Sequence, residues 1–169
     1  MSDAAKRPRT FVVLVEDVPG VLDRVASLFR RRAYNIESLS VGHTDREGVS
    51  HITVVIDADD RTASLVEANL YKLVHVIEVR DVSNLPSVVR DLALIKVRAD
   101  HKNRSEILQI AEVFRARVVD VSPEALIFEI TGSEDKINGL VDVLRPFGIL
   151  ELARTGVVAM ARATETVTV

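Results

Sequence analysis

The 169-residue sequence contains no cysteine and no tryptophan, and aromatic residues make up only 4% of it. The absence of cysteine excludes disulfides, thiolate metal ligands and a cysteine nucleophile. It also fits a reducing compartment, so we expect a cytoplasmic protein. Apolar runs such as Phe11 to Val15 fall far short of the roughly 20 residues that span a bilayer. We therefore expect neither a membrane span nor an export signal.

The sequence also has no excess of positive charge, since 22 Lys and Arg stand against 25 Asp and Glu, for a net charge of −3. A chain of this charge has no general attraction to nucleic acid. The run Arg30 to Arg32 stands at the end of an expected helix, where cations suit the helix dipole. No aromatic residues are interleaved there to stack on bases. We expect no nucleic-acid partner.

Hydrophobic residues make up 47% of the chain, and their spacing alternates between strand and helix periods in the order βαββαβ, twice. In the first half we expect strands at residues 10–16, 35–43, 50–57 and 74–82, and helices at 19–32 and 60–73. In the second half we expect strands at 92–99, 118–121, 125–131 and 149–160, and helices at 103–116 and directly after Ser133. This order predicts an α+β fold of two ferredoxin-like units, each an antiparallel sheet with both helices on one face.

The composition between these segments predicts the domain boundaries. We expect a disordered N-terminus (1–9), a first domain (10–83), a linker (84–88), a second domain (89–162) and a tail (163–169). The first strand is apolar on both of its sides, from Val12 to Val15. This indicates that the sheet face away from the helices is also covered, either by the second unit or by a partner chain.

The segment from Glu16 to Leu22 joins the first strand to the first helix and is the best candidate for a binding site. Pro19 suits a first helical turn, and Gly20 has no side chain to obstruct a ligand. Free amides at a helix start, together with the helix dipole, favour an anion such as a carboxylate. Asp17 is placed either to cap the helix or to receive a ligand ammonium group. The alternative is an ordinary capped helix start that binds nothing.

Other polar clusters predict no catalytic residue and no metal ligand. The four histidines (His43, His51, His75 and His101) have no metal-ligand spacing. In the acidic run from Asp57 to Asp60, Asp59 or Asp60 is better placed to cap the following helix than to bind a cation. The sequence contains no phosphate-binding loop, dinucleotide fingerprint or nucleophile elbow. A stand-alone enzyme is therefore the least favoured reading.

The stretch LVEDVPGVLDRVASLFRRRAYNIESLSVG, residues 14–42, resembles the start of the regulatory (small) subunit of acetohydroxyacid synthase, also called acetolactate synthase. The D-x-P-G-V-L turn alone indicates only the wider class of ACT amino-acid-sensing domains, and the segment from Tyr34 to Leu39 narrows the resemblance to this subunit. It continues in RDLALIKVRA (90–99), VFRARVVDVSPEAL (113–126) and ARTGVVAMAR (153–162). Several blocks in one order are more specific than a single motif.

The resemblance implies a subunit without an active site of its own. Its partner is a large catalytic subunit, a transferase of branched-chain amino acid biosynthesis, which holds thiamine diphosphate, magnesium and FAD. This chain carries no cofactor, activates that partner and confers feedback inhibition by valine or a related amino acid. The resemblance further implies a homodimer in which two ACT domains pair edge to edge. The second domain would serve activation. A free-standing ACT-type sensor of another enzyme is the alternative.

Carried onto this sequence, the resemblance places the effector carboxylate at the amides of Gly20, Val21 and Leu22, and its ammonium group at Asp17. The effector-binding residues also include Val18 and Pro19 of the same turn, with Asn35 and Ile36 of the neighbouring chain. Aliphatic side chains at 18, 21, 22 and 36 favour a branched aliphatic ligand.

One position departs from the family pattern. Many relatives carry glycine where this chain has Ala33. If that residue is left-handed, a side chain there costs about 1 kcal/mol. The placement of Asn35, two residues later, depends on this turn.

Overall fold

The computed structural model describes residues 5–164 and confirms the repeated βαββαβ order. The elements of the first repeat are β1 (Arg7–Glu16), α1 (Val21–Arg31), β2 (Ile36–His43), β3 (Val49–Ala58), α2 (Asp60–Leu70) and β4 (Val76–Asp81). Those of the second are β5 (Ser87–Arg98), α3 (Arg104–Val113), β6 (Arg117–Val121), β7 (Ala125–Gly132), α4 (Glu134–Leu144), the 3-10 turn η1 (Arg145–Phe147) and β8 (Ile149–Arg154). A last strand, β9 (Val158–Ala161), follows.

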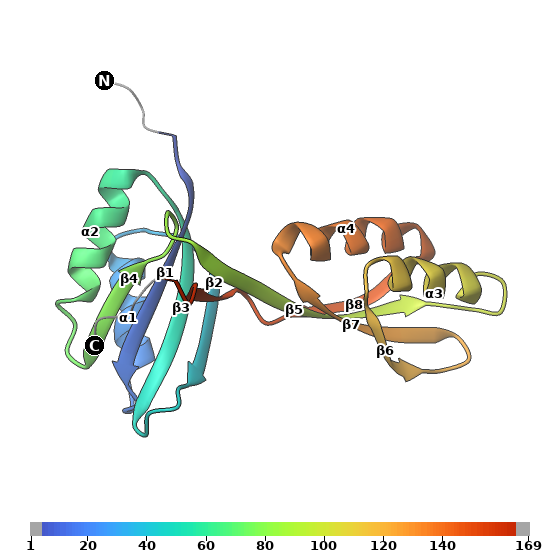
Figure 1. Ribbon diagram of the computed structural model, residues 1–169, viewed down its shortest axis with the longest axis horizontal. Helices are drawn as coiled ribbons and strands as arrows, with labels where there is room; N and C mark the ends of the chain where they lie inside the picture. Colours follow the sequence, from blue (N-terminus) through green and yellow to red (C-terminus); the bar gives the residue numbers. More distant parts are fainter. Residues whose placement is uncertain (1–4, 165–169) are drawn as a thin grey trace. The chain divides into compact units, whose positions relative to one another are not determined.

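The first sheet has the strand order β2-β3-β1-β4, and neighbouring strands pair antiparallel. Helices α1 and α2 lie on one side of it (Figure 1). Side chains alternate along β1, so that Phe11, Val13 and Val15 are fully buried against the helices. Val25 and Phe29 of α1 complete this core, because their spacing puts them on one face of the helix.

The second sheet repeats this topology in the order β6-β7-β5-β8, and β9 also pairs with β5. Ile95 and Phe128 face its helices and are fully buried. Ser133 caps α4 by accepting a hydrogen bond from the amide of Lys136 at 3.4 Å, as the sequence predicts. Over the described residues, none of these helices is long and apolar enough to cross a membrane.

The N-terminal boundary predicted from the sequence is wrong for residues 7–9, which we expected to be disordered. They belong to β1, with Arg7 opposite Ala58 of β3. Arg9 is only 4% exposed and forms ion pairs with Asp60 at 2.9 Å and Asp81 at 3.0 Å. The polar composition of these residues predicts disorder. Arg9 is buried in the strand nevertheless, because the carboxylates of Asp60 and Asp81 neutralise its guanidinium group. Residues 1–4 lie outside the described residues.

The chain forms two compact units whose limits differ from the expected ones at the C-terminal side. Within the described residues, the first unit contains residues 5–88 and 157–164, and the second contains 89–156. We expected residues up to 162 to complete the second domain. The structure groups β9 with the first unit, although this strand also pairs with β5. Ala159 of β9 is 1% exposed. This strand therefore supplies part of the cover that the apolar β1 predicts for the open sheet face. The predicted tail overlaps the described residues only at 163 and 164.

Candidate effector-binding site

The turn between β1 and α1 is built around Gly20. Its backbone has φ 85° and ψ −2°, a left-handed conformation that glycine adopts without strain. No heavy atom lies within 4 Å of the place a Cβ would take. Gly20 is the N-cap residue, and no side chain caps the helix. The space in front of this helix start is therefore open to a ligand.

The amides of this helix start are mostly unpaired. The amide of Val21 donates to the carbonyl of Val18 at 3.3 Å. Among residues 5–164, no acceptor lies within hydrogen-bond range of the amides of Gly20, Leu22 and Asp23. The set available to an anion is thus shifted from the predicted one, with Asp23 in place of Val21. Three such donors at the positive end of the helix dipole favour a carboxylate.

Asp17 stands at the entrance to this turn and does not cap the helix, which excludes one of its two predicted roles. Its amide donates to the carbonyl of Gly48 at 2.8 Å, which fixes its backbone against the β2–β3 turn. Its carboxylate lies 3.3 Å from Nδ1 of His43 at the end of β2. The Asp17 side chain remains 46% exposed and thus accessible to an ammonium group. Sequence reasoning did not find His43, which is far away in the chain.

The apolar residues of the turn divide into two groups. Val21 is 7% exposed and belongs to the core, so it supports the turn from beneath. Val18 is partly buried, whereas Pro19 and Leu22 are exposed. Pro19 precedes the N-cap, because α1 begins at Val21, two residues later than the sequence predicts. Val18, Pro19 and Leu22 are left to contact a ligand side chain.

Asn35 and Ile36 lie at the other end of α1. The helix ends with a residue of left-handed conformation, Ala33 at φ 55°, and the amide of Tyr34 donates to the carbonyl of Phe29 at 3.0 Å. Asn35 is exposed, and its amide nitrogen donates to the carboxylate of Glu37. Ile36 opens β2 and packs on the core.

Within one chain, the structure does not bring these two residues to the Gly20 turn. The 11 residues of α1 extend over about 16 Å between Gly20 and Asn35. Strand β2 pairs with β3 on one side and is the end strand of the described sheet. A ligand that touches both groups of residues therefore needs a second copy of the chain.

Comparison with known proteins identifies the family. Residues 11–78 match the family described as the AHAS small subunit-like ACT domain, and residues 90–163 match the family described as the small subunit of acetolactate synthase. A probable acetolactate synthase small subunit from Archaeoglobus fulgidus is 50% identical over 90% of this chain and 96% of its own length. The chain belongs to the acetolactate synthase small-subunit family.

Two further members support this assignment of the small subunit. The acetolactate synthase small subunit of Mycolicibacterium smegmatis is 48% identical over 90% of each chain. The crystal structure of the small subunit from Thermotoga maritima matches with a TM-score of 0.87 and 42% identity, over 92% of this chain and 98% of that one. This small subunit thus carries an ACT domain and has a regulatory role beside a catalytic chain. Its described residues hold no group of three acidic or histidine side chains that fits a metal ion.

Proposed function

We propose that this small subunit activates the catalytic subunit of acetolactate synthase and makes it sensitive to feedback by valine or a related branched-chain amino acid. The observation that carries the proposal is the Gly20 turn, which combines unpaired amides with an exposed carboxylate at Asp17. An α-amino acid presents the complementary pair of charges. Thiamine diphosphate, magnesium and FAD belong, in this proposal, to the catalytic partner.

The effector lies in this proposal between two copies of the chain. The separation of Asn35 and Ile36 from Gly20 along α1 supports a contribution from each copy. The outer edge of β2 is the surface through which a second ACT domain extends the sheet, and this pairing also protects the edge from aggregation. Asn35 offers both a donor and an acceptor to the zwitterion.

Selectivity for a branched aliphatic side chain follows from the residues around the turn. Val18, Leu22 and Ile36 offer aliphatic surface and no polar group that would satisfy a hydroxyl or a charge. A ligand with a polar side chain would lose hydrogen bonds to water without replacement. We therefore expect valine, leucine and isoleucine to bind more tightly than serine or aspartate.

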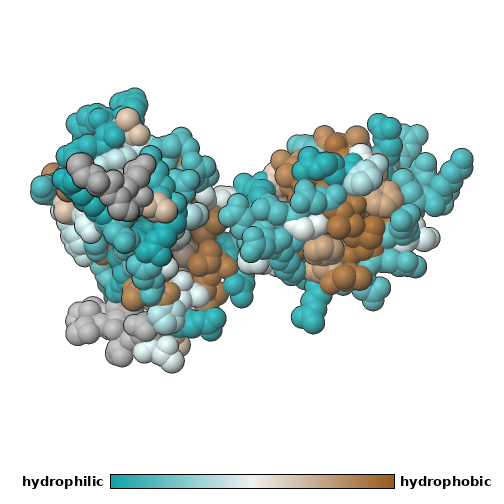
Figure 2. Space-filling model, turned by 90° about the horizontal axis from the view of Figure 1, so that it is seen from above, coloured by the Kyte–Doolittle hydropathy of each residue, from teal (hydrophilic) through white to brown (hydrophobic). Residues whose placement is uncertain are grey.

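The catalytic subunit binds, in this proposal, to the second unit. In the view of Figure 2 this unit presents a group of apolar residues at its surface. Leu108, Val113 and Val143 of α3 and α4 are 39%, 80% and 42% exposed. Apolar surface of this kind is typical of a protein–protein contact. If only one arrangement of the dimer supports the catalytic partner, an effector shifts activity by its differential affinity, about 1–3 kcal/mol in typical cases.

Calorimetric titration of valine, leucine and isoleucine into the purified protein, with and without the catalytic subunit, tests the proposal. The variant Gly20→Asp places a carboxylate where the ligand carboxylate binds, so we expect it to abolish valine inhibition and to keep activation. Gly20→Asn has nearly the same size and a similar tolerance of left-handed backbone, so it is the matched control for charge. It should retain more valine binding than Gly20→Asp. Undiminished inhibition in Gly20→Asp would contradict the site.

A further inference from the structure

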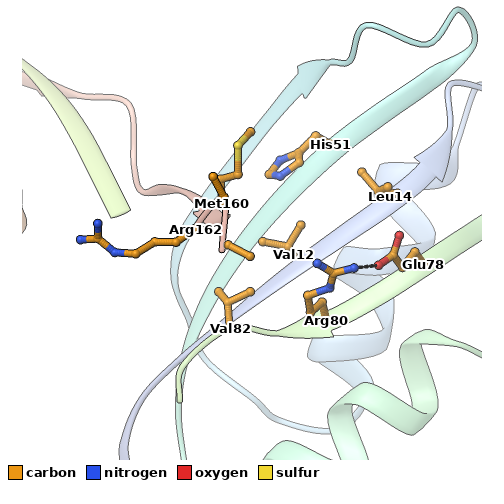
Figure 3. A pocket seen from close by; sticks show the side chains of 10 residues that line it. Val12, Leu14, His51, Glu78, Arg80, Val82, Met160 and Arg162 are labelled. Atoms are coloured by element: carbon orange, nitrogen blue, oxygen red, sulfur yellow. Dashed lines mark hydrogen bonds and ion pairs between the residues drawn. The ribbon is translucent and has the colours of Figure 1, made fainter. Parts of the chain in front are cut away.

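The residues 157–162, here called the C-terminal strap, lie on the face of the first sheet away from α1 and α2. Ala159 of the strap and Thr53 of β3 are each 1% exposed, although Thr53 points away from the helix-side core. Figure 3 shows Met160 of the strap beside His51 of β3, on the sheet face that also carries Val12 of β1. Open grooves of about 480 and 680 Å³ flank the strap. It therefore covers only a strip of the sheet.

The strap is held by side-chain hydroxyls of the sheet beneath it and by pairing of its strand β9 with β5. The amide of Val157 donates to Oγ of Ser38 on β2 at 2.8 Å, and the amide of Ala159 donates to Oγ1 of Thr53 at 3.4 Å. At its far end, the amide of Arg162 donates to the carbonyl of Pro86 at 2.9 Å. Because these contacts and the β5 pairing hold only a short segment, we expect the strap to open by local unfolding while the rest of the first sheet stays folded.

Ser38 connects this contact to the candidate effector site. It lies two residues after Ile36 on β2, and the register of β2 with β3 shifts between these two residues. The position of Ser38 thus depends on the same register shift that sets the position of Ile36. A ligand that holds Asn35 and Ile36 also restrains the hydroxyl that binds the strap.

At its other end the strap continues directly into the second unit. Gly156, with φ 84°, precedes it, and Arg154 ends β8. Arg154 donates through Nε to Asp91 of β5 at 2.7 Å, and Thr155 donates to the same carboxylate at 3.1 Å. Asp91 is 4% exposed. The chain before the strap is therefore firmly attached, so that binding or release of the strap acts on the end of β8.

We propose that the C-terminal strap is the link through which an occupied effector site acts on the second unit, with Ser38 as its positioning residue. This inference rests on the proposed function for the identity of the effector. The effector favours the strap-bound state because it fixes β2 around the register shift. Since coupling is reciprocal, the bound strap favours the effector by the same factor, between about 5-fold and 150-fold in typical proteins.

Amide hydrogen exchange at Val157 in the full-length protein, with and without saturating valine, tests the link. In the wild type, valine should slow this exchange at least 5-fold. In Ser38→Ala the amide loses its acceptor, so exchange is faster and valine no longer slows it, while calorimetry still detects valine binding. Ser40→Ala removes the next hydroxyl along β2, which bonds to no strap amide in the structure, and should behave as the wild type does. Ser38→Thr keeps the hydroxyl and should restore the response.

The two proposals fail in different ways. If the wild type does not bind valine, leucine or isoleucine, the proposed function is overturned and the coupling with it. If the wild type binds valine but the Val157 amide exchanges at the same rate with and without it, only the strap link is overturned. The holoenzyme gives a second measurement, since Ser38→Ala should require at least 5-fold more valine for half inhibition. Inhibition of Ser38→Ala at wild-type valine concentrations also overturns the link.

Discussion

In the first unit, the turn that leads into the first helix ends at Gly20, and no side chain caps the helix amides. In the second unit, the equivalent turn contains Asp100, whose carboxylate accepts hydrogen bonds from the amides of Lys102 at 2.8 Å and Asn103 at 3.1 Å. These bonds hold the pKa of Asp100 below its usual range. The second unit thus satisfies the two amides just before its helix with its own carboxylate, whereas the Gly20 amide of the first unit has no acceptor among the described residues. The turn before the helix is therefore internally hydrogen-bonded in one repeat and open in the other, which supports the proposed site in the first unit.

The ends of the same helices are alike in both units. Ala33 has φ 55° after α1, and Arg115 has φ 56° after α3. In both cases the next amide reaches back five residues, from Tyr34 to Phe29 and from Ala116 to Ala111. Helices α1 and α3 thus end in the same way, and the two units differ in the turn that precedes the helix. The difference lies where the ligand is proposed to bind.

Among the changes that test the difference between the units, removing one core aromatic ring from a unit should have the largest effect on stability. Phe11 and Phe128 are fully buried in the first and the second core. We expect Phe11→Ala and Phe128→Ala each to lower the stability of its own unit by about 3–5 kcal/mol. Phe11→Ala should also lose valine binding, and Phe128→Ala should retain it. Amide exchange measures each unit separately, and equal loss of protection in both units would show that they do not unfold independently.

A second test of the difference between the units uses Asn35, which follows Ala33 by two residues. Its counterpart in the second unit is Arg117, two residues after Arg115. We expect Asn35→Ala to weaken valine binding by about 10-fold or more, because a hydrogen bond to a charged ligand is lost. Arg117→Ala should leave the calorimetric affinity unchanged. Unchanged affinity in Asn35→Ala would remove this residue from the site.

Replacing Asp100 by alanine frees the two amides before the first helix of the second unit and has a smaller expected effect. We expect a lower Tm at pH 7, because the amides of Lys102 and Asn103 lose their acceptor. The pKa of Asp100 is lower in the folded than in the unfolded chain, so its contribution is complete above the ordinary aspartate pKa of about 3.9. It is lost as the pH falls through the lowered value. The difference in Tm between wild type and variant should therefore shrink in strong acid, and a difference independent of pH would contradict this account.

The smallest effect concerns the shared helix ends. Ala33→Gly and Arg115→Gly each relieve a side chain from left-handed backbone, so each should raise the free energy of unfolding by about 0.5–1 kcal/mol. Chemical denaturation measures both changes. Equal gains would confirm that the two units store the same strain, whereas destabilisation by Ala33→Gly would show that the alanine is needed there.

The sequence predicts the repeated order of elements well, because the period of the apolar residues follows the burial that the structure shows on β1, β3, β5 and β7. At position 33 the glycine of relatives raises a left-handed residue only as a condition, and the structure has Ala33 at φ 55°. The inclusion of Arg7 to Arg9 in β1 was missed, because their burial depends on Asp60 and Asp81, more than 50 residues away. The pairing of Asp17 with His43 was missed for the same reason.

The position of the C-terminal strap illustrates a limit of another kind. Periodicity predicts that residues around 158 form a strand and that β1 needs cover on its second face. Nothing local says that these two facts belong together, because the hydrogen bond from Val157 to Ser38 joins residues 119 positions apart. The proposed seam between two copies of the chain is likewise not encoded in any one segment, and the residues proposed for it rest on the family resemblance.

Because the strap belongs to the first unit, the second unit is an insertion within it, and the order of synthesis matters. The ribosome must make residues 89–156 before the strap exists. At 5–20 residues per second, this leaves the open face of the first sheet uncovered for about 3–14 seconds on the nascent chain. During this time the face is accessible to chaperones or to an early partner, before the strap covers part of it.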